Sequence, residues 1–106
     1  MRPRRISMPA VAKRGDIVEI RTVLLHPMIT GHTASGANTM PRQIVHTFEA
    51  RYDGETIFRA EILPGIAANP YLGFTTVATR TGDITFTWIE DGGARTVEQR
   101  RLTVEE

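Results

Sequence analysis

Apolar and polar side chains alternate with a two-residue period along most of this chain, and short glycine-containing turns separate the alternating segments. Successive side chains of a β-strand point to opposite faces, so this period predicts strands that bury one face. No long segment keeps the period of about 3.6 residues that an amphipathic helix requires. The strands expected from this pattern are a weak first strand from Ile6 to Val11 with a bend at Pro9, then Ile17 to His26, Ile44 to Tyr52, Glu55 to Ile62, Tyr71 to Thr79, Asp83 to Glu90 and Ala94 to Val104.

The number and spacing of these strands predict the fold class. Short strands joined by frequent turns are typical of antiparallel sheets that pack against each other. We therefore predict an all-β fold, an immunoglobulin-like β-sandwich of about seven antiparallel strands, with an open barrel as the alternative. The 106 residues suit a single domain, residues 1–106, and suffice for a core without disulfides or a structural metal.

The clearest hairpin joins the segments Ile44 to Tyr52 and Glu55 to Ile62. Asp53-Gly54 supplies a two-residue turn between them, and glycine tolerates the positive φ that a type I′ turn requires. We therefore expect these two strands to pair directly, with the turn at the tip of the hairpin.

The last expected strand changes phase along its length. Val97 has odd parity, whereas Leu102 and Val104 have even parity, so they cannot share one face of a regular strand. A β-bulge near Gln99 to Arg101 would bring them to the same face. We interpret the Arg100-Arg101 pair as a solvated edge.

Composition and charge exclude several classes of function. The net charge is +1, so the chain has no strong field for nucleic acid or acidic membranes, and no apolar run approaches the ~18 residues of a membrane span. The absence of cysteine excludes disulfides, thiolate-bound metals, thioesters and persulfides on this chain. The stretch after the basic start, Met1 to Arg5, is too short and too polar for the apolar region of a signal peptide. We expect a basic tail there, with no signal peptide.

No catalytic motif is apparent in the sequence. The chain has no G-x-S-x-G nucleophile elbow, no phosphate-binding glycine loop and no H-E-x-x-H metal motif. We therefore predict that the protein is not an enzyme and has no cofactor, catalytic residue or metal ligand. The alternative is a metalloenzyme in which a long loop brings His26, His32 and His46 together, since three imidazoles can hold zinc or copper.

An apolar patch on the second expected strand indicates a covered surface. Val23 and Leu25 lie on the same face as Glu19 and Arg21, so both faces of this strand become apolar towards its end. A solvated face does not need these side chains, and either the following loop or another chain covers them. The sequence leaves both options open.

Two irregular segments adjoin the ends of the strands. The segment Pro27 to Arg42 is longer than most loops of compact domains, and such loops are often functional. The segment Leu63 to Pro70 contains two prolines, which keep it out of a central strand. The two segments either form one recognition surface or only link the sheets. The candidate partner-binding residues are Val23, Leu25, His26, Met28, His32, Asn69, Pro70 and Tyr71.

Several short motifs occur in a characteristic order. They are Gly15 to Arg21, His26-Pro27-Met28 with Gly31-His32, Pro41-Arg42 with Ile44, Phe58-Arg59-Ala60, Ala67 to Tyr71, Phe86-Thr87-Trp88 and Asp91-Gly92-Gly93. In this order the set resembles the SoxZ family, the small subunits of the SoxYZ sulfur-carrier complexes of bacterial thiosulfate oxidation. The resemblance spans about residues 11 to 104, and the His-Pro-Met and Ala-Asn-Pro phrases are its specific parts.

The resemblance implies an immunoglobulin-like sandwich that pairs with a SoxY-like subunit. That partner carries the sulfur intermediate on a cysteine in a flexible, glycine-rich arm, so a SoxZ-like chain needs no cysteine. The resemblance also implies a non-catalytic role in the periplasm, export together with the partner, and contact with other sulfur-oxidation enzymes through the complex. An isolated subunit could form a homodimer through its apolar strand faces. The alternative from another class is a stand-alone immunoglobulin-like ligand-binding or adhesion module.

Overall fold

The computed structural model describes residues 4–24, 44–62 and 71–106, and within them the chain is almost entirely extended. Among these residues no helix has the length and apolar character of a transmembrane span. The strands are β1 Arg4–Ser7, β2 Val11–Lys13, β3 Ile17–Leu24, β4 Val45–Tyr52, β5 Glu55–Glu61, β6 Tyr71–Val77, β7 Gly82–Glu90 and β8 Arg95–Glu105, and the short 3-10 turn η1 Asp91–Gly93 joins the last two.

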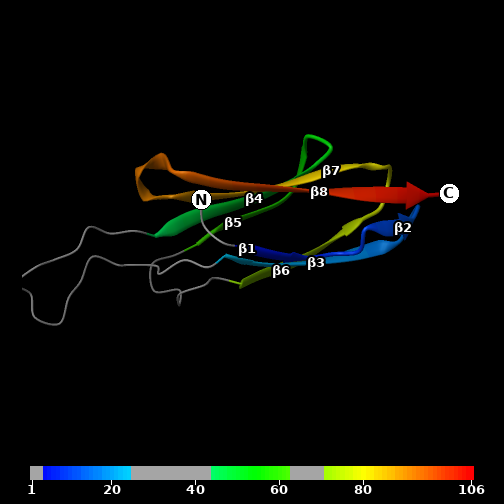
Figure 1. Cartoon of the computed structure of the whole chain (residues 1–106), viewed down its shortest axis with the longest axis horizontal. Helices are drawn as coiled ribbons and strands as arrows, with labels where there is room; N and C mark the ends of the chain where they lie inside the picture. The colour runs from blue at the N-terminus through cyan, green and yellow to red at the C-terminus, as the bar shows by residue number, and fades with distance from the viewer. Residues whose placement is uncertain (1–3, 25–43, 63–70) are drawn as a thin grey trace, which may run out of the picture.

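The strands form two sheets that pack face to face. A three-stranded sheet has the order β1-β3-β6, and a five-stranded sheet has the order β2-β8-β7-β4-β5. Figure 1 shows them as two layers, with β1, β3 and β6 in one and β4, β5, β7 and β8 in the other. The predicted immunoglobulin-like β-sandwich is therefore confirmed.

In the N-terminal segment the structure differs from the sequence prediction in one strand and in one strand pairing. The single strand expected from Ile6 to Val11 is in fact two strands, because β1 pairs with β3 in one sheet and β2 pairs with β8 in the other. Pro9 lies between them and has no amide hydrogen for a ladder, so the chain can change sheets there. The β2–β8 pairing is parallel, so the expectation of antiparallel strands throughout is wrong at this pair.

The core lies between the sheets and follows the predicted alternation. Phe48, Phe86 and Trp88 are fully buried, and the ring centroids of Phe48 and Trp88 lie 5.2 Å apart. The rings of Phe58 and Phe74 stack in parallel at 4.7 Å and connect β5 to β6 across the two layers. The remaining buried apolar side chains include Val18, Ile20, Leu24, Ala50, Tyr52, Ile84 and Leu102.

The bulge predicted in the last strand is wrong. The register between β7 and β8 runs without a shift from Gly82 opposite Leu102 to Ile89 opposite Arg95. Val97 does not need to reach the core, because it points outward and keeps 45% of its surface exposed. The register shifts occur instead in β4, between Ala50 and Arg51 against β5 and near Val45 against β7.

The turn between β4 and β5 has the predicted geometry. Asp53 has a φ of 51° and Gly54 a φ of 86°, so both central residues are left-handed, as a type I′ turn requires. Next to the turn, the hydroxyl of Tyr52 accepts a hydrogen bond of 3.2 Å from the amide of Arg80 and donates one to the carbonyl of Arg80. This contact ties the hairpin to the connection between β6 and β7, which links the two sheets.

Candidate partner-binding surface

The structure brings together the two candidate partner-binding residues that it describes. Val23 on β3 and Tyr71 on β6 are direct cross-strand partners in the three-stranded sheet. The other six candidates, Leu25, His26, Met28, His32, Asn69 and Pro70, lie outside the described residues.

Val23 and Tyr71 belong to the outer face of the three-stranded sheet, which points away from the core. Three of the five large apolar side chains that are exposed in the described part of the chain lie on this face: Ile17 at 76%, Tyr71 at 59% and Val77 at 49%. Val23 is half-buried on the same face. The outer face therefore carries apolar side chains on both β3 and β6, while Leu25, the other residue of the predicted patch, lies outside the described residues.

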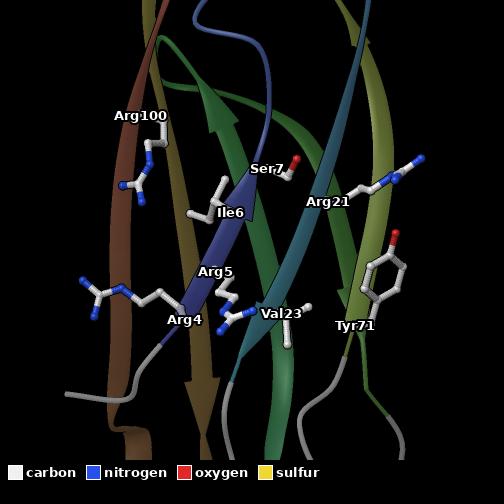
Figure 2. A pocket seen from close by; sticks show the side chains of 8 residues that line it. All are labelled: Arg4, Arg5, Ile6, Ser7, Arg21, Val23, Tyr71 and Arg100. Atoms are coloured by element: carbon white, nitrogen blue, oxygen red, sulfur yellow. The ribbon is translucent and has the colours of Figure 1, made fainter.

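A groove of about 600 Å³ runs along β1 at the edge of the sandwich, between the Val23–Tyr71 end of this outer face and β8. Figure 2 shows it from close by, with β1 at its centre, β3 and β6 on one side and β8 on the other. Its apolar part is formed by Ile6, Val23 and Tyr71, and its polar part is dominated by guanidinium groups. The polar lining residues are Arg4, Arg5, Ser7, Arg21 and Arg100.

One edge of the groove is an ion-pair network between the two sheets. Glu98 on β8 lies 2.7 Å from Nε of Arg4 on β1 and 2.7 Å from Nη1 of Arg100. The hydrogen bond from Arg100 is the main reason that the pKa of Glu98 lies below its ordinary value. Partial burial opposes this effect, while the amide of Gln99 and the charge of Arg4 add to it.

The other two arginines of the groove are Arg21, which has a carboxylate partner, and Arg5, which has none among the described residues. Arg21 donates a hydrogen bond of 2.6 Å from Nε to Oε1 of Glu19 on the same face. Arg5 has neither a hydrogen bond nor an ion pair from its side chain to any described residue. The groove therefore combines four arginines with two neighbouring carboxylates, Glu19 and Glu98, which leaves an excess of positive charge.

Sequence reasoning missed most of this groove. The sequence predicts a basic tail at the N-terminal arginines, whereas Arg4 and Arg5 lie on β1. The sequence also predicts a solvated edge at Arg100 and Arg101, but Arg100 faces Glu98 at the groove, and of the two only Arg101 lies on the other face, where it pairs with Asp83. The missing information was the β1–β3 pairing, which places Arg5 opposite Val23.

The structure tests the three-histidine hypothesis only in part. His46 lies on β4, and its Nδ1 is 2.8 Å from Oγ1 of Thr47. His26 and His32 lie outside the described residues. Within the described ranges, no group of three or more histidine, aspartate or glutamate side chains could hold a metal ion.

Comparisons with known proteins give one family and several solved structures. The family model described as "Sulphur oxidation protein SoxZ" matches residues 5–101. The sequence has no significant match among curated proteins. Among solved structures, the chain is similar to a superoxide reductase (neelaredoxin) from Ignicoccus hospitalis, with a TM-score of 0.73 and 17% identity over 96% of this chain and 79% of that one.

Two further structures share the architecture. The sulfur carrier protein SoxY from Chlorobium limicola f. thiosulfatophilum has a TM-score of 0.68 and 14% identity over 97% of this chain and 79% of that one. The CARDB domain of a Pyrococcus furiosus protein has a TM-score of 0.53 and 10% identity over 99% of this chain and 94% of that one. At these identities the likeness establishes the sandwich fold alone, because one fold serves many functions.

Proposed function

The chain belongs to the SoxZ family of sulfur oxidation proteins, and from this premise we propose that it is the non-catalytic subunit of a SoxYZ-type sulfur-carrier heterodimer. The family match over residues 5–101 carries this proposal and gives the chain a role in sulfur oxidation. In the proposed complex, a SoxY-like subunit holds the sulfur on a cysteine, and this chain binds that subunit and presents it to other enzymes.

The outer face of the three-stranded sheet is the proposed docking surface. Centres of protein interfaces are rich in tyrosine, arginine and apolar side chains, with charged residues at the rim. Tyr71 and Val23 lie side by side here, and Arg5 and Arg21 flank them in the register of the sheet. The face extends to the exposed Ile17 and Val77 at its other end, and Glu19, Arg21, Gly73 and Thr75 lie between these two apolar pairs.

The absence of cysteine suits this role chemically. A thiolate attacks a disulfide or persulfide sulfur, so a thiol near the cargo would compete for it. This chain contains no cysteine and offers no such nucleophile. It can therefore remain in contact with a sulfur-loaded partner without exchanging with its cargo.

We place the working complex in the periplasm, with this chain exported together with its partner. The resemblance to the SoxZ family supports this location. Cell fractionation with and without the partner's export signal tests it: the chain should remain in the cytoplasm when the partner's signal is deleted. Periplasmic accumulation without that signal would contradict joint export.

Co-expression with the cognate SoxY-like subunit tests the heterodimer. The two chains should elute together from size-exclusion chromatography as a one-to-one complex at micromolar concentration. Elution as two separate species at that concentration would contradict the proposal. The isolated chain, run on the same column, shows whether it self-associates when the partner is absent.

The substitution Tyr71→Ala tests the docking surface. Exposed tyrosines at interface centres often contribute strongly to binding, so we expect the dissociation constant to rise at least about tenfold. The matched control is Val97→Ala, since Val97 is also an exposed apolar residue on a strand but faces outward from the other sheet. Equal affinity of the Tyr71→Ala and Val97→Ala variants, measured by titration calorimetry, would place the interface elsewhere.

A further inference from the structure

Among the described residues, Arg5 has no hydrogen-bond or ion-pair partner for its side chain, whereas the other three arginines of the groove are paired. The acidic residues of this protein, twelve in all, lie within the described ranges. No carboxylate side chain from another part of the chain is therefore available to neutralise Arg5. Figure 2 shows its guanidinium beside Val23, its cross-strand neighbour.

The surroundings of Arg5 combine an apolar floor with further donors. Val23 and the ring of Tyr71 form this floor on the face of Arg5, and Ile6 lines the groove from the other side of β1, where it packs against the core. The ring of Tyr71 lies over Gly73, where an added Cβ would stand 3.3 Å from the tyrosine Oη. Gly73 is opposite Arg21 in the sheet, so the tyrosine hydroxyl lies on the side of the groove where Arg21 stands.

This arrangement fits an oxyanion better than a neutral ligand. A guanidinium presents several N–H donors in a planar fork, which matches the oxygens of a carboxylate, sulfonate or phosphate. An apolar floor lowers the local dielectric and strengthens the attraction between such charges. Among the described residues, the polar lining of the groove contains four arginines and one serine and no carboxylate.

The size of the groove indicates that the anion arrives on a longer group. Ligand-binding cavities typically measure about 300–1,000 Å³, and this groove of about 600 Å³ lies within that range. A free inorganic oxyanion would fill only a small part of it and would leave the apolar floor uncovered. A peptide that carries the oxyanion could use both the floor and the arginines.

We propose that the groove binds a sulfonate-type oxyanion carried on a peptide segment, with Arg5 as its principal ligand and Arg21 and Arg100 at its rim. Oxidised sulfur groups are oxyanions, and the family of this chain acts in sulfur oxidation. The inference rests on the proposed function, because the segment that carries the group belongs to the partner subunit. In this position the chain would hold the charged end of the cargo without reacting with it.

Titration calorimetry of the full chain in chloride buffer tests the inference with three probes. The first is a short peptide with one S-sulfonated cysteine, the second is the same peptide with a free thiol, and the third is sodium thiosulfate. We expect the S-sulfonated peptide to bind at least about tenfold more tightly than the thiol peptide, because a hydrogen-bonded ion pair is lost in the second case. Thiosulfate should compete for the site with lower affinity than the S-sulfonated peptide.

Arg5→Gln should abolish the preference for the sulfonated peptide. The matched control is Arg101→Gln, which removes a similarly exposed arginine of β8 that lies on the opposite face from the groove. In the wild-type chain, backbone amide NMR shifts at Val23 and Tyr71 should follow the titration. Equal binding of the two peptides, no binding of either, or an unchanged preference in Arg5→Gln would overturn the inference.

The failure of this inference can be separated from a failure of the proposed function. The heterodimer is measured with the whole partner subunit, in the absence of any sulfonated probe. A chain that binds the partner but shows no preference between the peptides retains the proposed function and loses only the oxyanion site. A chain that does not bind the partner loses the proposed function itself.

Discussion

The carboxylate of Glu98 forms ion pairs with arginines of both sheets. Its carboxylate accepts contacts from Arg4 on β1 and from Arg100 on its own strand, and all three side chains are partly shielded from water. Because ionised Glu98 is stabilised in the folded state, its pKa there is lower than in the unfolded chain. Glu49 has the same direction of shift, caused mainly by its hydrogen bond from Arg51, but it joins strands of one sheet only.

The substitution Glu98→Gln should reduce the loss of stability in acid. The folded-state pKa is depressed, so the contribution of Glu98 is present above the unfolded value near 4.5 and is lost as the pH falls through the folded-state pKa. The wild type should lose more of its unfolding free energy than the variant between about pH 7 and about pH 3. Urea unfolding followed by Trp88 fluorescence at several pH values measures the difference.

Glu55→Gln is the control for this prediction, because Glu55 is exposed and has no ion pair among the described residues. The Glu55→Gln variant should keep the wild-type pH dependence of the unfolding free energy. A Glu98→Gln variant with the same pH dependence as the wild type would show that the ion pair between the sheets contributes no net stability in solution.

At the scale of the elements, the β4–β5 hairpin depends on a turn that only certain residues can adopt. Both turn residues have positive φ, a region in which a Cβ collides with the backbone. An added Cβ at Gly54 would meet nothing within 4 Å, so packing imposes no further restriction there. The positive φ alone therefore explains why glycine is favoured at position 54.

Gly54→Ala should destabilise the protein by about 1 kcal/mol, since alanine in the left-handed region is strained by about 1–2 kcal/mol. Gly54→Asn is the matched control and should lose less, because asparagine tolerates positive φ better than alanine does. Urea unfolding gives both free energies. Equal losses for the two variants would mean that the turn relaxes to another geometry.

At the scale of the whole molecule, the two sheets share one core, and the N-terminal segment contributes a strand to each of them. β1 and β2 place the N-terminal segment in different sheets, and β2 pairs with the C-terminal strand β8. Such pairings join residues far apart in the sequence, which typically gives folding times of about milliseconds to seconds. Neither sheet can keep its inner face covered without the other.

Unfolding should therefore be a single cooperative transition. Trp88 is the only tryptophan and lies in the shared core, so its fluorescence reports on the packing of the two sheets. The urea midpoint from tryptophan fluorescence should coincide with the midpoint from far-ultraviolet circular dichroism, which reports on the strands. Two separated midpoints would show that one sheet persists without the other.

The sequence determined the features that depend on neighbouring residues. The two-residue alternation predicted strands with one buried face, and in β7 this face carries Ile84, Phe86 and Trp88, because side-chain direction in a strand has a fixed period. Asp53-Gly54 predicted the hairpin, because the turn requires positive φ at its two central residues. The family resemblance also came from local motifs, and the match over residues 5–101 agrees with it.

Which distant segments meet depends on tertiary packing and could not be predicted from local sequence. The change of sheets after β1 and the parallel β2–β8 pair depend on long-range packing, which local alternation does not encode. Arg4 and Glu98 are 94 positions apart, and the groove exists because their strands face each other across the sandwich edge. The bulge prediction failed for the same reason: parity alone cannot show that Val97 is free to face solvent. The sequence determined side-chain direction within each strand, while the pairing of strands far apart in the chain decided where the arginines gather.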